Sequence, residues 1–224
     1  MPTSPSGRCR RSRRPPGGPC RTKVWDYGDS GAGTEATVRR NRTALERVLL
    51  RPQVLRGVAE RDTTRSLLGA ELALPVVLAP VGGLALFTPG GALAAARAAH
   101  AAGTVPFIGM LSSPRLEEVA AQSSGPLYFQ LYVQGDRSWL KDMVQRVESA
   151  GFCALAVTVD TPVHPRRERD ISNDFIPQEA RDRPNLDGTP PIEGDRGQHR
   201  ASFDWDDLAW LRGVTRLRWS SRAS

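Results

Sequence analysis

Four short apolar segments that alternate with helical segments constrain the fold of this chain more than any other feature. The apolar segments, which are rich in β-branched and aromatic residues, are 75–80, 105–110, 127–133 and 154–160. The helical segments that follow them are 89–102, 115–122, 136–150 and 204–214. Strands that alternate with helices at this spacing predict βα units, and therefore a parallel sheet in an α/β fold.

The number of units decides between the parallel architectures. A closed TIM (β/α)8 barrel needs eight βα units and about 250 residues, whereas this chain of 224 residues offers about four. The Gly-rich turn that opens a dinucleotide-binding sheet does not follow the first strand. The prediction is the first half of a barrel, preceded by a helix over 37–50 and by a hairpin over 66–74 that turns at Gly69.

The basic character of the chain is confined to its beginning. The net charge is +7, but residues 1–23 hold seven basic side chains and no acidic one, so the remainder is neutral overall. This Pro-, Gly- and Ser-rich stretch is predicted to be a disordered tail, with binding to an anionic surface as an alternative role. It carries no aromatic pattern for specific nucleic-acid binding, and no apolar run approaches the roughly 18 residues of a membrane span.

The composition leads to further expectations about the cysteines, the location and the polar stretches. The three cysteines form neither a disulfide framework nor a metal-site spacing, and the predicted location is the cytoplasm. The polar stretch 176–200, with many Pro, Gly and charged residues, is predicted to be mobile. The last residues, 216–224, are predicted to be an irregular end, which leaves 24–215 as the folded part.

The fourth apolar segment ends in a loop that is crowded with arginines. Thr158 and Asp160 close the strand, and Arg166, Arg167 and Arg169 follow it. Ligands of parallel α/β folds bind beyond the carboxyl ends of the strands, and a guanidinium group suits a carboxylate or phosphate. The alternative is a solvated loop in which these arginines pair with Glu168 and Asp170.

Several motifs occur in an order that resembles the FMN-dependent α-hydroxy acid dehydrogenases and oxidases, the group of glycolate oxidase and the flavin L-lactate dehydrogenases. They are Asp26-Tyr27, Gly31-Ala32, Glu35-Ala-Thr37, Asn41-Arg42, Leu50-Arg51-Pro52, Leu78-Ala-Pro80, Glu117-Glu-Val119, Phe129-Gln-Leu-Tyr-Val133, Thr158-Val-Asp-Thr-Pro162, Arg166-Arg-Glu-Arg-Asp170 and Phe203-Asp-Trp205. The resemblance covers about residues 24–215. It implies an FMN-binding TIM barrel that oxidises a small 2-hydroxy acid to the 2-oxo acid.

The resemblance also implies roles for individual residues. Those expected to bind FMN are Pro80, Val81, Gly82, Gln130 and Thr158, and those expected to bind the substrate are Tyr27, Tyr132 and Arg167. The first three would contact the flavin through their backbone, and Arg167 would hold the substrate carboxylate. Gln130 and Tyr132 are two residues apart on a strand and therefore share a face. An amide and a hydroxyl can satisfy the flavin's polar edge without adding charge.

Three departures from the family pattern qualify this interpretation. Gly109 stands where the family has a serine that touches the flavin, and His164-Pro165 stands where a glycine commonly precedes the arginine pair. The family's base histidine and flavin-stabilising lysine have no counterpart here, since the histidines and lysines are His100, His164, His199, Lys23 and Lys141. The alternative hypothesis is therefore a catalytically incompetent fragment that at most binds flavin or a carboxylate. Half a barrel also exposes strand edges, which a homo-oligomer or a complementing carboxyl-terminal half would cover.

Overall fold

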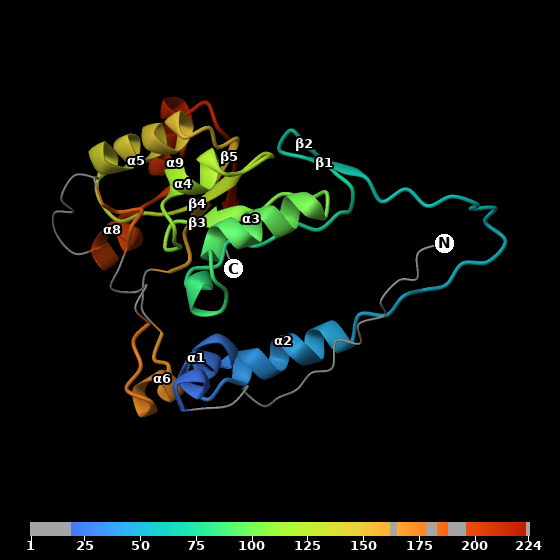
Figure 1. The fold of residues 1–224 in the computed structure, drawn as a ribbon, viewed down its shortest axis with the longest axis horizontal. Coiled ribbons are helices and arrows are strands. Elements are labelled where there is room, and N and C mark those ends of the chain that lie inside the picture. Colours follow the sequence, from blue (N-terminus) through green and yellow to red (C-terminus); the bar gives the residue numbers. More distant parts are fainter. Residues whose placement is uncertain (1–18, 162–164, 178–182, 188–195, 223–224) are drawn as a thin grey trace. The chain divides into compact units, whose positions relative to one another are not determined.

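The computed structural model describes residues 19–161, 165–177, 183–187 and 196–222, which form two compact units (Figure 1). One unit comprises Met1–Leu49 with Pro165–Ile176, and we call it the arginine-loop unit. The other comprises Leu50–His164 with Pro177–Ser224, and we call it the sheet unit. The described part of the predicted tail and the predicted arginine loop thus belong to a unit of their own.

The sheet unit contains the predicted βα alternation. Its four strands run parallel in the order β3-β4-β5-β6, and their bounds are β3 Phe107–Gly109, β4 Tyr128–Tyr132, β5 Ala154–Thr158 and β6 Arg218–Arg222. The helices between them are α3 Gly91–Ala101, α4 Leu116–Ala121, α5 Arg137–Ser149 and α9 Trp205–Val214. This is the partial barrel that the sequence predicts, and among the described residues the sheet does not close.

The two faces of the sheet differ because neighbouring residues on a strand point in opposite directions. Phe129, Leu131 and Leu155 join the main core, with apolar residues of α4, α5 and α9. The opposite residues at the amino ends of the strands, Tyr128 and Ala154, pack in a smaller core with the hairpin residues Ala70 and Leu72. The same face towards the carboxyl ends carries Gln130 and Thr158.

The predicted hairpin over 66–74 is present as β1 (Arg65–Leu67) and β2 (Ala70–Leu72). Both turn residues, Leu68 and Gly69, have positive φ, as the tight I′ turn of hairpins requires. Tyr128 of β4 donates a hydrogen bond from its hydroxyl to the carbonyl of Leu67. The hairpin therefore covers the amino-terminal part of one face of the sheet and leaves the carboxyl-terminal part to Gln130 and Thr158.

The structure corrects the two ends of the predicted sheet. The first predicted strand, 75–80, is reduced to a single parallel bridge between Leu78 and Pro106, since Pro75 and Pro80 have no N–H to donate. The end predicted to be irregular, 216–224, contains β6, which pairs with β5 over five residues. Backbone pairing with an existing strand does not need the apolar pattern that the sequence prediction relied on.

The long polar stretch predicted to be mobile is ordered where it is described. Asn185 is completely buried, and the helix α8 spans Arg196–Ser202. Asp204 caps the helix α9, which begins at Trp205, and its side chain accepts from the backbone N–H groups of Asp206 and Asp207 in a capping box. Residues 178–182 and 188–195 lie outside the described part, so the prediction stands untested there.

The arginine-loop unit consists of α1 Pro19–Asp29, α2 Ala36–Glu46 and α6 Glu168–Ser172. Because α1 begins at Pro19, the tail predicted over 1–23 is wrong for its last five residues, and residues 1–18 lie outside the described part. The helix predicted over 37–50 ends at Glu46 and buries none of its residues. A short helix, α6, replaces the predicted loop after Arg167. None of the described helices has the length and apolar character that crossing a bilayer requires.

Candidate functional site

A row of polar and small residues crosses three neighbouring strands near their carboxyl ends. Strand register places Gly109 of β3 beside Gln130 of β4, and places Tyr132 of β4 beside Thr158 of β5. Gln130 is 3% exposed and donates a 2.8 Å hydrogen bond from Nε2 to Oγ1 of Thr158. The structure thus joins two of the residues predicted to bind the cofactor into one neutral pair, of which Gln130 is buried and Thr158 partly buried.

The backbone of the segment 80–82 borders the same row. A Cβ built on Gly109 would lie 3.6 Å from the carbonyl group of Val81 and 3.6 Å from Oε1 of Gln130. Gly82 in turn approaches the next loop, because its Cβ would lie 3.1 Å from the carbonyl oxygen of Leu111. The backbone of Val81 therefore lies beside Gly109, next to Gln130, and that of Gly82 lies against the loop after β3.

Tyr132 lies one step further along β4, towards the carboxyl end. It is half-buried against the main core, and its backbone N–H lies 3.5 Å from the sulfur of Met110. His100 lies at the other end of the sheet, because its Nε2 is 3.0 Å from the carbonyl oxygen of Pro126, before β4 begins. His164 lies outside the described residues, and His199 lies on α8.

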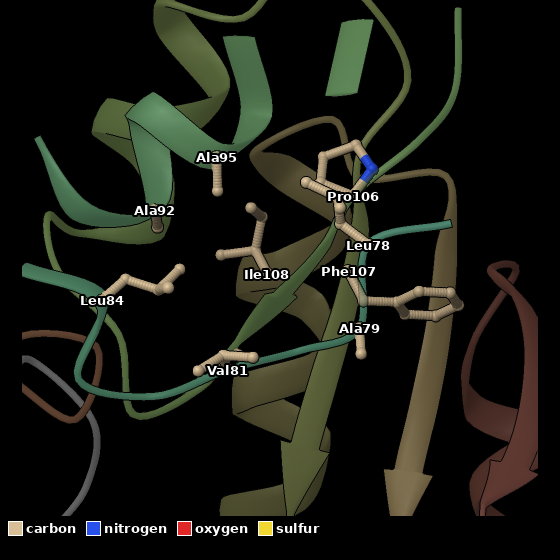
Figure 2. A pocket seen from close by; sticks show the side chains of 10 residues that line it. Leu78, Ala79, Val81, Leu84, Ala92, Ala95, Pro106, Phe107 and Ile108 are labelled. Carbon is tan, nitrogen blue, oxygen red and sulfur yellow. The ribbon is translucent and has the colours of Figure 1, made fainter. Parts of the chain in front are cut away.

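A small apolar cavity lies behind the segment 78–81, between this segment, β3 and α3 (Figure 2). Its volume is about 180 Å³, and its walls include Leu78, Val81, Ala92, Ala95 and Ile108. No polar side chain lines it. Because a void gives the residues around it no packing partner on that side, the cavity leaves the segment weakly supported.

Arg167 and Tyr27, two of the residues predicted to bind the substrate, contact each other in the arginine-loop unit. The guanidinium carbon lies 4.6 Å from the centre of the Tyr27 ring. Nη2 donates to the Tyr27 carbonyl and, over 2.8 Å, to the Ser30 hydroxyl. Nε lies 3.0 Å from the Asp170 carboxylate, of which only 15% is exposed.

The neighbouring arginines also form ion pairs. Arg166 lies 3.8 Å from Glu168, and both side chains are largely exposed. Arg169 makes a 2.8 Å contact with Glu35 and lies 3.7 Å from Asp26. The pairing of this segment with its own acidic residues, one of the two alternatives from the sequence, is therefore present. The contacts of Arg167 use Nε and Nη2, and Nη1 has no hydrogen-bond partner among the described residues.

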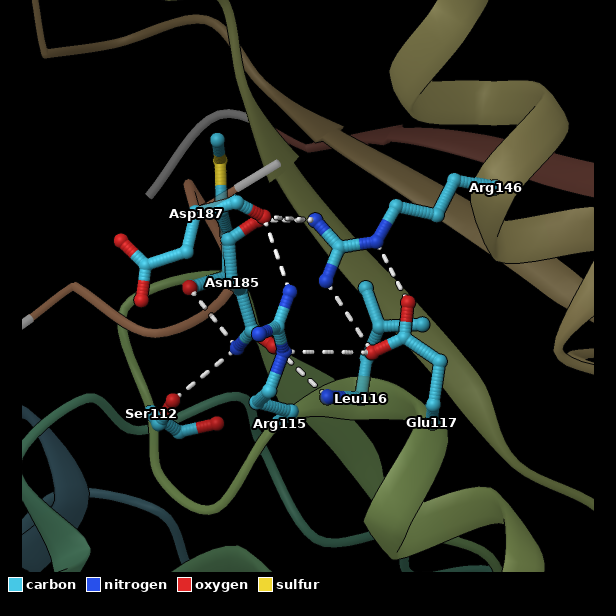
Figure 3. A network of polar contacts seen from close by, with 8 residues as sticks. Ser112, Arg115, Leu116, Glu117, Arg146, Asn185 and Asp187 are labelled. Carbon is cyan, nitrogen blue, oxygen red and sulfur yellow. Dashed lines mark hydrogen bonds and ion pairs between the residues drawn. The ribbon is translucent and has the colours of Figure 1, made fainter. Parts of the chain in front are cut away.

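A buried polar network joins the loop after β3 to α4, α5 and the segment 183–187 (Figure 3). Asn185 donates from Nδ2 to the carbonyl groups of Met110 and Ser112, over 3.1 and 2.9 Å, and accepts from the Leu116 N–H over 2.6 Å. Arg146 holds the Asn185 carbonyl and pairs with Glu117. Sequence reasoning missed this network, because its partners are far apart in sequence and follow no periodic pattern.

The fold and the site together define a class of protein. Parallel βα units that carry neutral polar side chains at the strands' carboxyl ends are typical of a ligand-binding α/β barrel. The sequence profile of the FMN-dependent dehydrogenases matches residues 19–220. The chain belongs to the FMN-dependent dehydrogenase family, whose cofactor is FMN.

Individual relatives agree with this membership. The chain is 38% identical over 205 residues to the glycolate oxidases of Oryza sativa and Spinacia oleracea, a match that covers 87% of this chain and 56% of each relative. A crystal structure of mandelate oxidase superposes with a TM-score of 0.77 at 37% identity, covering 91% of this chain and 57% of that one. The (S)-mandelate dehydrogenase of Pseudomonas putida superposes with 0.76 at 30% identity, covering 89% and 59%. The chain thus spans little more than half the length of these relatives.

The residues of the sheet unit fit the flavin of this family. The row offers a neutral amide and a neutral hydroxyl, which match the donors and acceptors at the edge of a flavin ring. Gly82 and Gly109 carry no side chain that would obstruct a flat ring near the main chain, and Val81, beside the row, is exposed. Gly109 lacks the hydroxyl that the family places there, which removes one hydrogen bond worth about 1 kcal/mol.

Proposed function

We propose that this chain provides the flavin-binding part of a site that oxidises a small 2-hydroxy acid to the 2-oxo acid. The observation that carries the proposal is the partly buried hydrogen bond between Gln130 and Thr158, beside Gly109 and the backbone of Val81. Pro80, Val81 and Gly82 would contact the flavin ring through their main chain. Bound FMN would accept the two electrons that the hydroxy acid loses.

The substrate contacts belong to the same proposal. Tyr132 would direct its hydroxyl at the substrate from the carboxyl end of β4, and Tyr27 with Arg167 would hold the carboxylate. Arg167 suits this task because its guanidinium is oriented by Asp170, Ser30 and the Tyr27 ring, and Nη1 retains donors for a ligand. A lactate-like or glycolate-like acid has the matching charge. We also propose a cytoplasmic location, and pairing with a second copy of the chain or with a complementing carboxyl-terminal half that would cover the open strand edges.

The second candidate function is flavin or carboxylate binding without turnover. A general base must come within hydrogen-bond reach of the proton that it removes. His100, whose imidazole contacts the Pro126 carbonyl at the amino end of β4, lies at the wrong end of the sheet for this task. The polar side chains of the sheet, those of Gln130, Thr158 and Tyr132, are by contrast suited to binding and orienting a ligand.

One experiment separates the two candidates. The full chain is mixed with FMN, the flavin spectrum of the protein fraction is recorded, and glycolate, L-lactate or (S)-mandelate is added without oxygen. Retained flavin that bleaches with an acid supports oxidation, retained flavin that does not bleach supports flavin binding alone, and no retained flavin contradicts both oxidation and flavin binding. Gln130→Leu should reduce retention, whereas Gln145→Leu on the exposed side of α5 serves as the matched control.

A further inference from the structure

The segment that would contact the flavin through its backbone has little support of its own. The stretch 75–80 makes one isolated bridge to the rest of the sheet, through Leu78 and Pro106. The cavity of about 180 Å³ lies behind it and removes packing from that side (Figure 2). Something else must therefore fix the position of Val81 and Gly82.

The loop after β3 provides that support. The carbonyl oxygen of Leu111 lies 3.1 Å from where a Cβ of Gly82 would be, so the two main chains are in close contact. The loop is joined to the row of polar residues as well, because the N–H of Met110 donates a 3.0 Å hydrogen bond to the Gln130 carbonyl. A shift of this loop would move both borders of the proposed flavin site.

Asn185 holds this loop from the other side. Its Nδ2 donates to the carbonyl groups on either side of Leu111, those of Met110 and Ser112, and its Oδ1 accepts from the N–H of Leu116 (Figure 3). The side chain is completely buried, and one residue satisfies three backbone groups that have no strand or helix partner there. Loss of such a contact leaves buried polar groups unpaired, which is costly.

The position of Asn185 is fixed in turn by Arg146. Nη1 of Arg146 donates to the carbonyl groups of Asn185 and Asp187, over 2.6 and 3.2 Å. Its Nε and Nη2 hold both oxygens of Glu117, so the guanidinium is bound in a bidentate pair. The Arg115 side chain contacts the Asp187 carbonyl and Glu117, at the exposed margin of the network.

We propose that Asn185 is a positioning residue for the flavin, which acts by holding the loop 110–112 against Gly82. The inference rests on the proposed function, because it concerns the same site. The hydrogen bonds of the Asn185 side chain go to Met110, Ser112 and Leu116, so Asn185 would act on the flavin through this loop. The segment 183–187, which looks like an ordinary surface loop in the sequence, thereby becomes part of the support of the cofactor site.

The test compares FMN affinity in three variants of the full chain, measured by the quenching of FMN fluorescence. Asn185→Asp keeps the acceptor for Leu116 but cannot donate to Met110 and Ser112, and it should weaken FMN binding about tenfold. Glu117→Gln loosens Arg146 and should weaken it about threefold. Glu118→Gln, the matched control on the exposed side of α4, should leave the affinity unchanged.

A second readout separates positioning from general stability. Amide hydrogen exchange should become faster in 109–112 of Asn185→Asp while β4 and β5 keep their protection, a pattern that overall destabilisation would not give. A folded Asn185→Asp that binds FMN as the unaltered chain does would overturn the inference. Should that variant not fold, an unchanged affinity in Glu117→Gln would overturn it. An unaltered chain that binds no FMN would instead contradict the proposed function.

Discussion

The two groups of predicted site residues are held by different kinds of interaction. In the sheet unit, Gln130 and Thr158 are neutral, and the register of parallel strands brings them together. In the arginine-loop unit, Arg167 and Tyr27 are held by charge, through Asp170 and the ring contact. The first arrangement follows from strand pairing, whereas the second depends on a few side chains that a single substitution can remove.

This difference predicts unequal sensitivity to mutation. Removal of a charged partner leaves the other charge buried without compensation, which is more costly than the loss of a neutral hydrogen bond. The sheet pair also keeps its backbone frame when one side chain changes, since β4 and β5 are joined by five residue pairs. The described part of the arginine-loop unit contains no sheet, and α1 and α6 meet through the contacts of Arg167 and its neighbours.

The largest expected effect is that of Arg167→Met. The substitution leaves the Asp170 carboxylate, which is 15% exposed, without its partner and removes the hydrogen bonds to Tyr27 and Ser30. We expect the arginine-loop unit to lose about 2–3 kcal/mol of stability. Hydrogen exchange should accelerate in 24–46 and 165–176 and remain unchanged in 107–158.

The control is Arg166→Met, because the Arg166 side chain is 76% exposed and pairs only loosely with Glu168. Its exchange should match that of the unaltered chain. Equal protection of the arginine-loop unit in both variants would mean that the contacts of Arg167 do not hold this unit together. The predicted difference in sensitivity between the site residues of the two units would then be wrong.

A smaller effect is expected from Thr158→Val. Valine has a similar shape but cannot accept a hydrogen bond, so the buried amide of Gln130 loses its partner, at a cost of about 1–2 kcal/mol to the sheet unit. Thr158→Ser keeps the hydroxyl and should retain most of the stability. Hydrogen exchange in β4 and β5 measures both. A loss of stability in Thr158→Val as large as that in Arg167→Met would contradict the predicted difference between the sheet unit and the arginine-loop unit.

The same difference explains how much the sequence could predict. Gln130, Tyr132 and Thr158 lie on strands whose apolar alternation fixes their face, so their shared site follows from the pattern. The order β3-β4-β5 was predictable for the same reason. The strand β6 was not, because the sequence of Arg218–Arg222 has no apolar pattern, although its backbone pairs with β5.

Side-chain networks between distant segments were beyond sequence reasoning. Asn185 reaches Met110 and Ser112, which are 75 and 73 residues away, and no spacing rule connects these positions. Arg167 was recognised as a ligand candidate through its family motif, but its ion pair with Asp170 was only one of two alternatives. Local pattern thus predicts strands and faces, whereas contacts across loops require the folded structure.

The smallest expected effect is a pH dependence of the stability of the sheet unit. The Gln130–Thr158 pair does not titrate, but hydrogen bonds from Arg146 hold the pKa of the Glu117 carboxyl below its ordinary value of 4.5. The unfolded chain therefore binds this proton at a higher pH than the folded chain does. The contribution of the Glu117–Arg146 pair to the stability of the sheet unit is complete above pH 4.5 and is lost as the pH falls through the folded-state pKa of Glu117.

Because 44% of the Glu117 side chain is exposed, solvent screens the pair, and the contribution stays below about 1 kcal/mol. Hydrogen exchange in 107–158 at pH 7 and at pH 3.5 measures it. The stability difference between the unaltered chain and Glu117→Gln should shrink at the lower pH, whereas Glu118→Gln, on the exposed side of α4, should show no such change. A difference that stays constant with pH would mean that the carboxylate of Glu117 does not contribute through its charge, and that the Arg146 anchor depends on shape and hydrogen bonding alone.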